Sequence, residues 1–174
     1  MADHLDVLFS EDQIRARIAD LARALEAELA GEEVLLVAVL KGSVHFLSDF
    51  ARELRLESKL DFMQTSSYGA EKSSSGIVQI RKDLDINIEG VNVVLVEDIV
   101  DTGITLSHLR ELLATRKPKS LRVVSLLSKT EARRVQIPIE HIGFEIPSEF
   151  VVGYGLDYAE RFRNLPYIAI LREA

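Results

Sequence analysis

One segment, from Val93 to Leu106, limits what this chain can fold into more than any other. It begins with four consecutive apolar residues, a pattern that predicts a strand buried on both faces. Two adjacent carboxylates, Glu97 and Asp98, come at the carboxyl end of that strand, and Asp101 follows them. Because leucines at helical spacing begin after Thr105, the sequence predicts a strand, a turn and a helix in direct succession.

The turn between this strand and this helix has the chemistry of a phosphate site. Backbone N–H groups at the start of a helix lack partners, and the helix dipole favours an anion there. Gly103 lets the backbone approach a ligand closely, and Thr102 and Thr105 add hydroxyl donors. The segment lacks the GxxxxGK[ST] pattern of a Walker loop. Since bare carboxylates repel phosphate, Glu97 and Asp98 should face sugar hydroxyls and a hard cation such as magnesium. The alternative is an ordinary buried strand with a polar turn.

Composition narrows the class of protein. A chain of 174 residues suits one domain and can bury about 70% of its unfolded surface. It has no cysteine, which excludes disulfides and fits a cytoplasmic location. The net charge is −7, with no block of Lys and Arg, so a broad nucleic-acid surface is not expected. No apolar run approaches the roughly 20 residues that cross a membrane, and the first residues lack a signal pattern.

The remaining apolar patterns predict strands and helices in alternation. A helix should begin after Ser10, which forms a capping box with Gln13, and should end near Gly31. A second helix should contain Val44 and Phe50. Further strands are predicted at residues 34–40, 59–66, 76–82 and 121–127. This alternation indicates an α/β fold, with a mostly parallel central sheet and helices on both faces.

The carboxyl ends of parallel strands are where such sheets place their sites. Lys41, Asp98 and Lys129 each come where a predicted strand ends. We therefore expect these three side chains to converge at the same edge of the sheet.

Two segments fall outside this alternation. Residues 137–174 show short strands and turns, which we interpret as a small antiparallel hood within a single domain of residues 1–174. Residues 67–76 are polar and rich in Ser and Gly. Such a stretch is either a lid over a site or the tip of a hairpin.

The run Val-Leu-Val-Glu-Asp-Ile-Val-Asp-Thr-Gly-Ile-Thr, Val94 to Thr105, resembles the phosphoribosyl-pyrophosphate-binding signature of the type I purine phosphoribosyltransferases. It is most similar to that of the hypoxanthine-guanine members. Downstream, Gly-Phe-Glu-Ile-Pro, Phe-Val-Val-Gly-Tyr and Leu-Asp-Tyr-x-Glu-x-Phe-Arg occur in the family's order, so the resemblance covers about Leu40 to Arg163.

The resemblance implies an activity. A purine salvage enzyme of this family transfers the 5-phosphoribosyl group from phosphoribosyl pyrophosphate to hypoxanthine or guanine. The products are IMP or GMP and pyrophosphate. Magnesium is the implied cofactor, and a cytoplasmic homodimer or homotetramer is the implied assembly.

The resemblance also implies roles for single residues. Asp101 would be the catalytic base that faces N7 of the purine. The ribose and 5′-phosphate would bind Glu97, Asp98, Asp101, Thr102, Gly103, Ile104 and Thr105. The pyrophosphate would bind Lys41, Gly42, Ser43 and Arg163. The purine would bind Lys129, Phe150, Val151 and Asp157.

The metal would bind Glu97, Asp98 and Asp157, and a lid would begin at Ser67 and Tyr68. Family members often hold the peptide bond between Leu40 and Lys41 in the cis form, and we expect the same here.

Three other kinds of protein share parts of this pattern. A regulator that keeps the fold and binds RNA is disfavoured by Asp101 and by the acidic charge. A transferase for adenine or pyrimidines would usually lack an Asp at position 101. A phosphoribosyl-pyrophosphate synthetase has a similar signature but needs a much longer chain.

Overall fold

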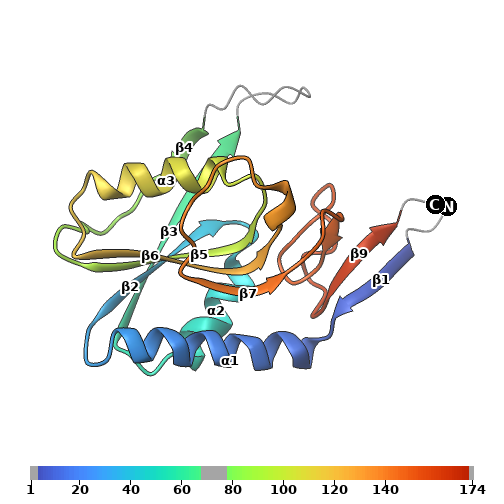
Figure 1. Cartoon of the computed structure of the whole chain (residues 1–174), viewed down its shortest axis with the longest axis horizontal. Coiled ribbons are helices and arrows are strands. Elements are labelled where there is room, and N and C mark those ends of the chain that lie inside the picture. Colours follow the sequence, from blue (N-terminus) through green and yellow to red (C-terminus); the bar gives the residue numbers. More distant parts are fainter. Residues whose placement is uncertain (1–3, 68–77, 173–174) are drawn as a thin grey trace.

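The computed structural model describes residues 4–67 and 78–172. A six-stranded sheet with the order β4-β3-β2-β5-β6-β7 runs through its centre (Figure 1). The strands are β2 (Val34–Leu40), β3 (Ser58–Ser67), β4 (Val78–Lys82), β5 (Asn92–Val100), β6 (Ser120–Ser128) and β7 (His141–Glu145). Neighbouring strands are parallel except β3 and β4, which confirms the predicted mostly parallel sheet.

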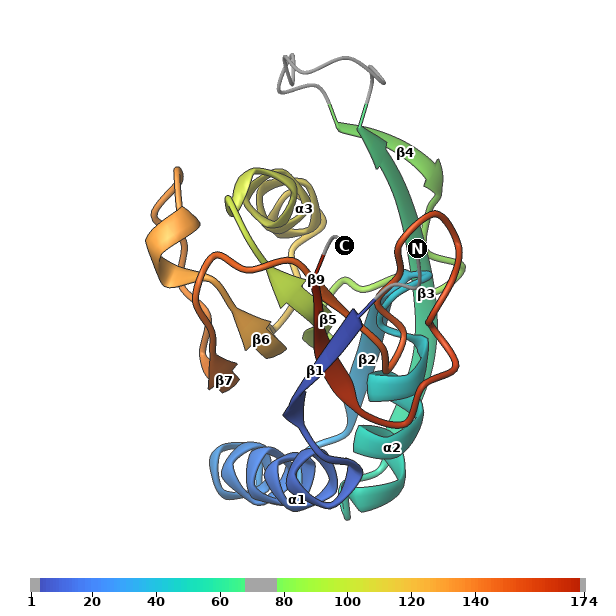
Figure 2. The ribbon, with the colours of Figure 1, turned by 90° about the vertical axis from the view of Figure 1, so that its right-hand side faces the viewer.

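Helices cover both faces of this sheet, as predicted (Figure 2). The helices α1 (Glu11–Glu28) and α2 (Val44–Glu53) pack on one face, and α3 (Ile104–Ala114) packs on the other. Side chains alternate between the two cores along β5, so that Val94 and Val96 join one core while Val93 and Leu95 join the other. Both faces of β5 are therefore apolar, which explains its continuous apolar sequence.

The start of α1 confirms the predicted capping box. The Ser10 side chain accepts a hydrogen bond from the Gln13 backbone, and the Gln13 side chain accepts one from the Ser10 backbone. The helix ends with Leu29 as its C-cap, two residues before Gly31, which has φ +79°. One apolar stripe of α1, including Ile14, Ile18 and Leu25, lies in the core.

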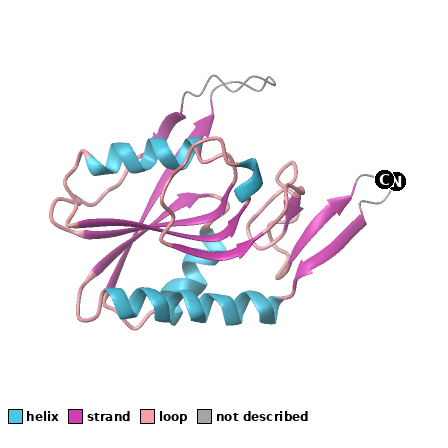
Figure 3. Ribbon diagram, viewed as in Figure 1, coloured by secondary structure: helices cyan, strands magenta, loops and turns pink. Residues whose placement is uncertain are grey.

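A second, three-stranded sheet forms the hood beside the carboxyl ends of the main strands (Figure 3). Its order is β1 (His4–Phe9), β9 (Ile168–Arg172) and β8 (Val151–Val152), all antiparallel. The predicted hood boundary at residue 137 is wrong, because β7 pairs in parallel with β6 and extends the main sheet. The amino-terminal strand β1, which no local pattern predicted, completes the hood instead.

Two further observations concern the chain as a whole. The peptide bond between Leu40 and Lys41 is cis, as the family resemblance implied. Among the described residues, no helix combines the length and the apolar character that crossing a bilayer requires.

Candidate active site

A cleft of about 350 Å³ opens at the carboxyl ends of β2, β5 and β6, on the side of the hood. It brings together nine of the residues predicted from the sequence, together with Ile99 and Leu156. The nine are Lys41, Gly42, Asp98, Asp101, Lys129, Phe150, Val151, Asp157 and Arg163. The predicted convergence of Lys41, Asp98 and Lys129 is therefore confirmed.

Glu97 and Asp98, near the end of β5, form what we call the acidic floor. Asp98 lines the cleft, whereas the predicted residue Glu97 lies beside it in the chain and does not. Glu97 is 7% exposed, and burial together with the charge of Asp98 raises its pKa well above the usual range. Burial also raises the pKa of Asp98 to about 6, although the charge of Arg163 opposes this shift. A Cβ at Gly42 would lie 1.6 Å from Asp98 Oδ2, so the floor touches the loop that follows β2.

The turn from β5 into α3 depends on Gly103. Its φ is +82°, and a Cβ there would lie 2.8 Å from Arg133 Cδ. The helix has no side-chain cap and no acidic residue in its first turn. The backbone N–H of Ile104 makes only a long, 3.4 Å bond to the Thr102 hydroxyl. The amino terminus of α3 is therefore an uncapped helix start, and the phosphate site there stays a prediction.

Lys41 and Arg163 form the cationic rim of the cleft. Lys41 Nζ lies 2.9 Å from Glu160 Oε2. Arg163 Nη2 lies 2.9 Å from Asp157 Oδ1 and 3.2 Å from Glu160 Oε1. Arg163 also donates to the Gly155 carbonyl, while its buried Nε has no acceptor among the described residues. The rim is thus held in place by ion pairs with Asp157 and Glu160 and by the Gly155 carbonyl.

The side of the cleft near β6 combines a lysine with an aromatic wall. Lys129 is 9% exposed, and its Nζ lies 3.5 Å from Asp101 Oδ2. Phe150 is 51% exposed, unusually high for a large apolar side chain, and meets Tyr158 edge to face. An exposed ring beside a nearly buried lysine can hold a flat, polar molecule.

Several predicted residues lie outside this cleft or outside the described chain. The Ser43 side chain is fully buried, and its hydroxyl donates to the Val39 carbonyl. Any ligand contact of Ser43 must therefore come from its backbone. Thr105 belongs to the first turn of α3 and does not line the cleft. Ser67 ends β3, while Tyr68 and the rest of the predicted lid lie outside the described residues.

Arg133 is a residue of the site that the sequence did not reveal. Its Nε donates to the Asp101 carbonyl at 3.2 Å, and its Nη2 donates to the Ser128 hydroxyl at 2.8 Å. It therefore ties the turn before α3 to the end of β6, beside Lys129. The sequence shows only that Arg133 follows soon after a predicted strand, and the same is true of the adjacent Arg134. The sequence alone therefore does not distinguish the two arginines.

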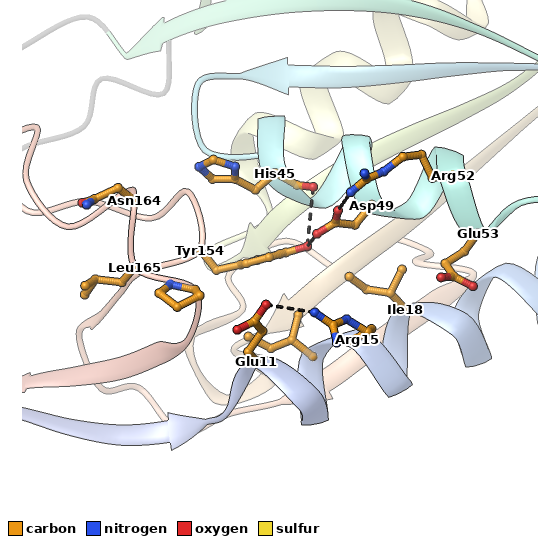
Figure 4. Close-up of a pocket in the computed structure, with 12 residues that line it drawn as sticks. Glu11, Arg15, Ile18, His45, Asp49, Arg52, Glu53, Tyr154, Asn164 and Leu165 are labelled. Carbon is orange, nitrogen blue, oxygen red and sulfur yellow. Dashed lines mark hydrogen bonds and ion pairs between the residues drawn. The ribbon is translucent and has the colours of Figure 1, made fainter.

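A larger cavity, about 530 Å³, lies between α1, α2 and the hood (Figure 4). Its charged side chains mostly pair with one another, for example Arg15 with Glu11 and Arg52 with Asp49. Tyr154 reaches from the hood and donates to Asp49 Oδ2 at 2.5 Å (Figure 4). The cavity contains none of the predicted site residues, and we assign the chemistry to the smaller cleft at the strand ends.

Known proteins match both the sequence and the fold. Residues 5–159 match the family model described as a phosphoribosyl transferase domain. The chain is 50% identical over 175 residues to the hypoxanthine-guanine phosphoribosyltransferase of Mycobacterium avium, an alignment that covers 97% of this chain and 86% of that protein. It is 48% identical over 170 residues to the hypoxanthine phosphoribosyltransferase of Escherichia coli strain K12, covering 97% and 96%.

A solved structure gives the same result. A hypoxanthine-guanine phosphoribosyltransferase from Bacillus anthracis superposes with a TM-score of 0.93 at 45% identity. The match covers 96% of this chain and 98% of that chain. By sequence and by fold, the chain belongs to the phosphoribosyl transferase family.

Proposed function

We propose that this protein is a purine salvage enzyme that transfers the 5-phosphoribosyl group from phosphoribosyl pyrophosphate to hypoxanthine, guanine or both. The products are IMP or GMP and pyrophosphate. One observation carries the proposal: Asp98 of the acidic floor, the cationic rim and the pair of Lys129 and Phe150 all line one cleft. Each of these groups suits a different part of the two substrates.

The 5′-phosphate is proposed to bind at the amino terminus of α3. The helix offers N–H groups there without a side-chain cap or an acidic neighbour. Gly103 keeps the turn open for close approach, because glycine adopts this positive φ without strain and a Cβ would meet Arg133. The hydroxyls of Thr102 and Thr105 are the proposed additional donors. The other end of the donor molecule then extends across the floor toward the rim.

The acidic floor is proposed to hold the ribose hydroxyls and Mg²⁺, with Asp157 as a further carboxylate. Within the described residues, no cluster of three or more His, Asp or Glu side chains could hold a metal unaided. Mg²⁺ in such sites commonly uses one or two carboxylates together with substrate phosphates and water, so the two floor carboxylates fit it. When bound, the ion would neutralise the departing pyrophosphate.

Lys41 and Arg163 are proposed to bind the pyrophosphate as its bond to the anomeric carbon breaks. Backbone groups of Gly42 and Ser43 are proposed to join them in this subsite. The Lys41 and Arg163 side chains already hold carboxylate oxygens in the free protein, which supports a role in binding an anion. Negative charge on the floor suits the positive charge that develops on the ribose.

Asp101 is proposed to take the N7 proton of the purine while another ring nitrogen bonds to the sugar. Lys129, 3.5 Å from Asp101, would donate to the 6-oxo group. Because a lysine offers donors only, an amino group at this ring position is disfavoured, and adenine should be a poor substrate. Phe150 would stack on the base and the Val151 backbone would meet its edge.

The substrates also bear on where the protein acts. Phosphoribosyl pyrophosphate and nucleotides carry several charges and do not cross membranes unaided. We therefore propose that the protein acts in the cytoplasm, where such compounds are retained. A homodimer or homotetramer stays a prediction from the family resemblance.

A direct assay tests the proposed function. The purified protein is incubated with phosphoribosyl pyrophosphate, Mg²⁺ and each of hypoxanthine, guanine, xanthine and adenine, and nucleotide formation is measured by chromatography. We expect IMP or GMP to form, with little AMP and no product without the metal. Failure to join any oxopurine to the phosphoribosyl group would refute the proposal.

A further inference from the structure

Glu160 lies between the two cations of the rim, where its carboxylate has the position that an anionic ligand would need. One carboxylate oxygen is 2.9 Å from Lys41 Nζ and the other is 3.2 Å from Arg163 Nη2. These two cations are the residues proposed above to bind pyrophosphate, so this inference rests on the proposed function. A carboxylate that bridges a lysine and an arginine makes the same charge-assisted hydrogen bonds as a phosphate group.

The backbone of this segment is bent to present Glu160. Tyr158 and Arg161 exchange two backbone hydrogen bonds, 3.1 and 3.0 Å long, around the central residues Ala159 and Glu160. Both central residues have positive φ, +50° and +62°. Turns of this kind favour Asn and Gly, because other residues are strained at positive φ. This turn, strained at Ala159 and Glu160, carries the Glu160 side chain that reaches both cations of the rim.

The ion pairs of Glu160 are of a kind that a ligand can break. The Glu160 and Lys41 side chains are 65% and 57% exposed. Exposed ion pairs are weak because water screens them and because their long side chains lose freedom. A buried carboxylate at the same position would be difficult to displace. Pyrophosphate, which carries more negative charge than a single exposed carboxylate, should therefore bind Lys41 and Arg163 more strongly than Glu160 does.

We propose that Glu160 is a positioning residue that occupies the pyrophosphate subsite in the free protein and is displaced from Lys41 and Arg163 when pyrophosphate, free or as part of the donor, binds. Until then it keeps the two cations directed at the cleft. Glu160 also competes with the ligand, and so it favours release of the pyrophosphate product.

Binding of pyrophosphate without turnover tests this role. Titration calorimetry measures the affinity for pyrophosphate with Mg²⁺ present and no purine. Glu160→Gln keeps the size of the side chain but removes the competing charge. We expect affinity to rise about three- to ten-fold, because the two ion pairs of an exposed carboxylate no longer compete. The KM for phosphoribosyl pyrophosphate should fall by a similar factor, while the KM for hypoxanthine should stay unchanged. A purely structural role would not separate the two constants.

A second variant and a control complete the test. Glu160→Gly removes the carboxylate and also relieves the turn, so it should bind pyrophosphate more tightly and unfold at a higher temperature than the parent. Glu32→Gln, which removes an exposed carboxylate paired with Lys119 away from the cleft, should leave pyrophosphate binding unchanged.

The outcomes separate two failures. If the parent protein binds no pyrophosphate, the proposed function fails. If the parent binds it and both Glu160 variants bind equally or more weakly, the function stands and the role of Glu160 is overturned.

Discussion

The acidic floor and the cationic rim differ in how the free protein satisfies their charges. On the floor, the pKa values of Glu97 and Asp98 are raised by burial, and among the described residues no lysine or arginine forms an ion pair with either. On the rim, Lys41 and Arg163 already pair with carboxylates. The floor is thus organised to gain a cation, while the rim is organised to exchange one anion for another. The two halves of one cleft prepare for ligands of opposite charge in different ways.

The largest expected effect is at Asp101, which belongs neither to the acidic floor nor to the cationic rim. We propose that Asp101 acts as the catalytic base and does not bind pyrophosphate. Asp101→Asn should lower kcat by about 10²–10⁴, the usual contribution of a general acid or base. Pyrophosphate binding at the rim should stay close to that of the parent. Steady-state kinetics and titration calorimetry measure the two effects.

Asp85→Asn is the matched control, because Asp85 is exposed, pairs with Lys82 and does not line the cleft. A value of kcat for Asp101→Asn within a few-fold of the parent would count against Asp101 as the base.

The raised pKa values of Glu97 and Asp98 predict that the stability of the protein depends on pH. A carboxyl whose pKa is higher in the folded chain than in the unfolded chain favours folding at low pH and loses that contribution as pH rises. For Asp98 the free energy of unfolding should therefore fall between about pH 4 and pH 6 in metal-free protein. Asp98→Asn should stabilise the protein at neutral pH by up to about 3 kcal/mol and flatten this dependence.

Urea denaturation across this pH range, with a chelator present, measures the effect. Glu97 keeps some of the dependence in the variant, because burial raises its pKa as well. If Asp98→Asn were less stable than the parent at neutral pH, the charged Asp98 carboxylate would not be unfavourable in the folded, metal-free protein.

A variant of Lys129 tests whether this cation, which lies near the acidic floor, binds the purine rather than the phosphates. Lys129→Gln introduces an acceptor next to the base, so the preference for hypoxanthine over adenine should fall about ten-fold, the equivalent of one hydrogen bond. The ratio of kcat/KM for the two bases measures it. Lys119→Gln serves as the control at an exposed site away from the cleft. Unchanged base selectivity would remove Lys129 from this role.

Tyr154 gives the smallest expected change and tests how the segment between β8 and β9, which carries Arg163, is attached to the rest of the protein. Tyr154→Phe removes the hydrogen bond to Asp49 on α2. This should lower stability by about 0.5–1.5 kcal/mol and the melting temperature by about 1–6 °C. Turnover should stay near that of the parent, because Tyr154 does not line the cleft. Scanning calorimetry at matched pH measures the shift, and an unchanged melting temperature would show that this bond does not hold the segment.

The parts of the molecule that could be predicted are those that local sequence encodes. The apolar run of β5, the turn at Gly103 and the capping box at Ser10 each depend on residues close together in the chain. The convergence of Lys41, Asp98 and Lys129 followed from a general property of parallel sheets.

The parts that could not be predicted depend on pairing between distant segments. Strand β1 pairs with β9 across almost the whole chain, and its half-exposed pattern carries no clear period. Arg133 bonds to Asp101, 32 residues away, and Glu160 bonds to Lys41, 119 residues away. The turn that presents Glu160 has central residues that ordinarily argue against such a turn, so no local rule identified it.

A crystal structure of Asp101→Asn with Mg²⁺ and phosphoribosyl pyrophosphate tests the central claim most directly. We predict the 5′-phosphate on the N–H groups at the start of α3, the ribose hydroxyls over Glu97 and Asp98, and the pyrophosphate on Lys41 and Arg163 in place of Glu160. A donor molecule bound away from this cleft, for example in the cavity between α1, α2 and the hood, would contradict the account.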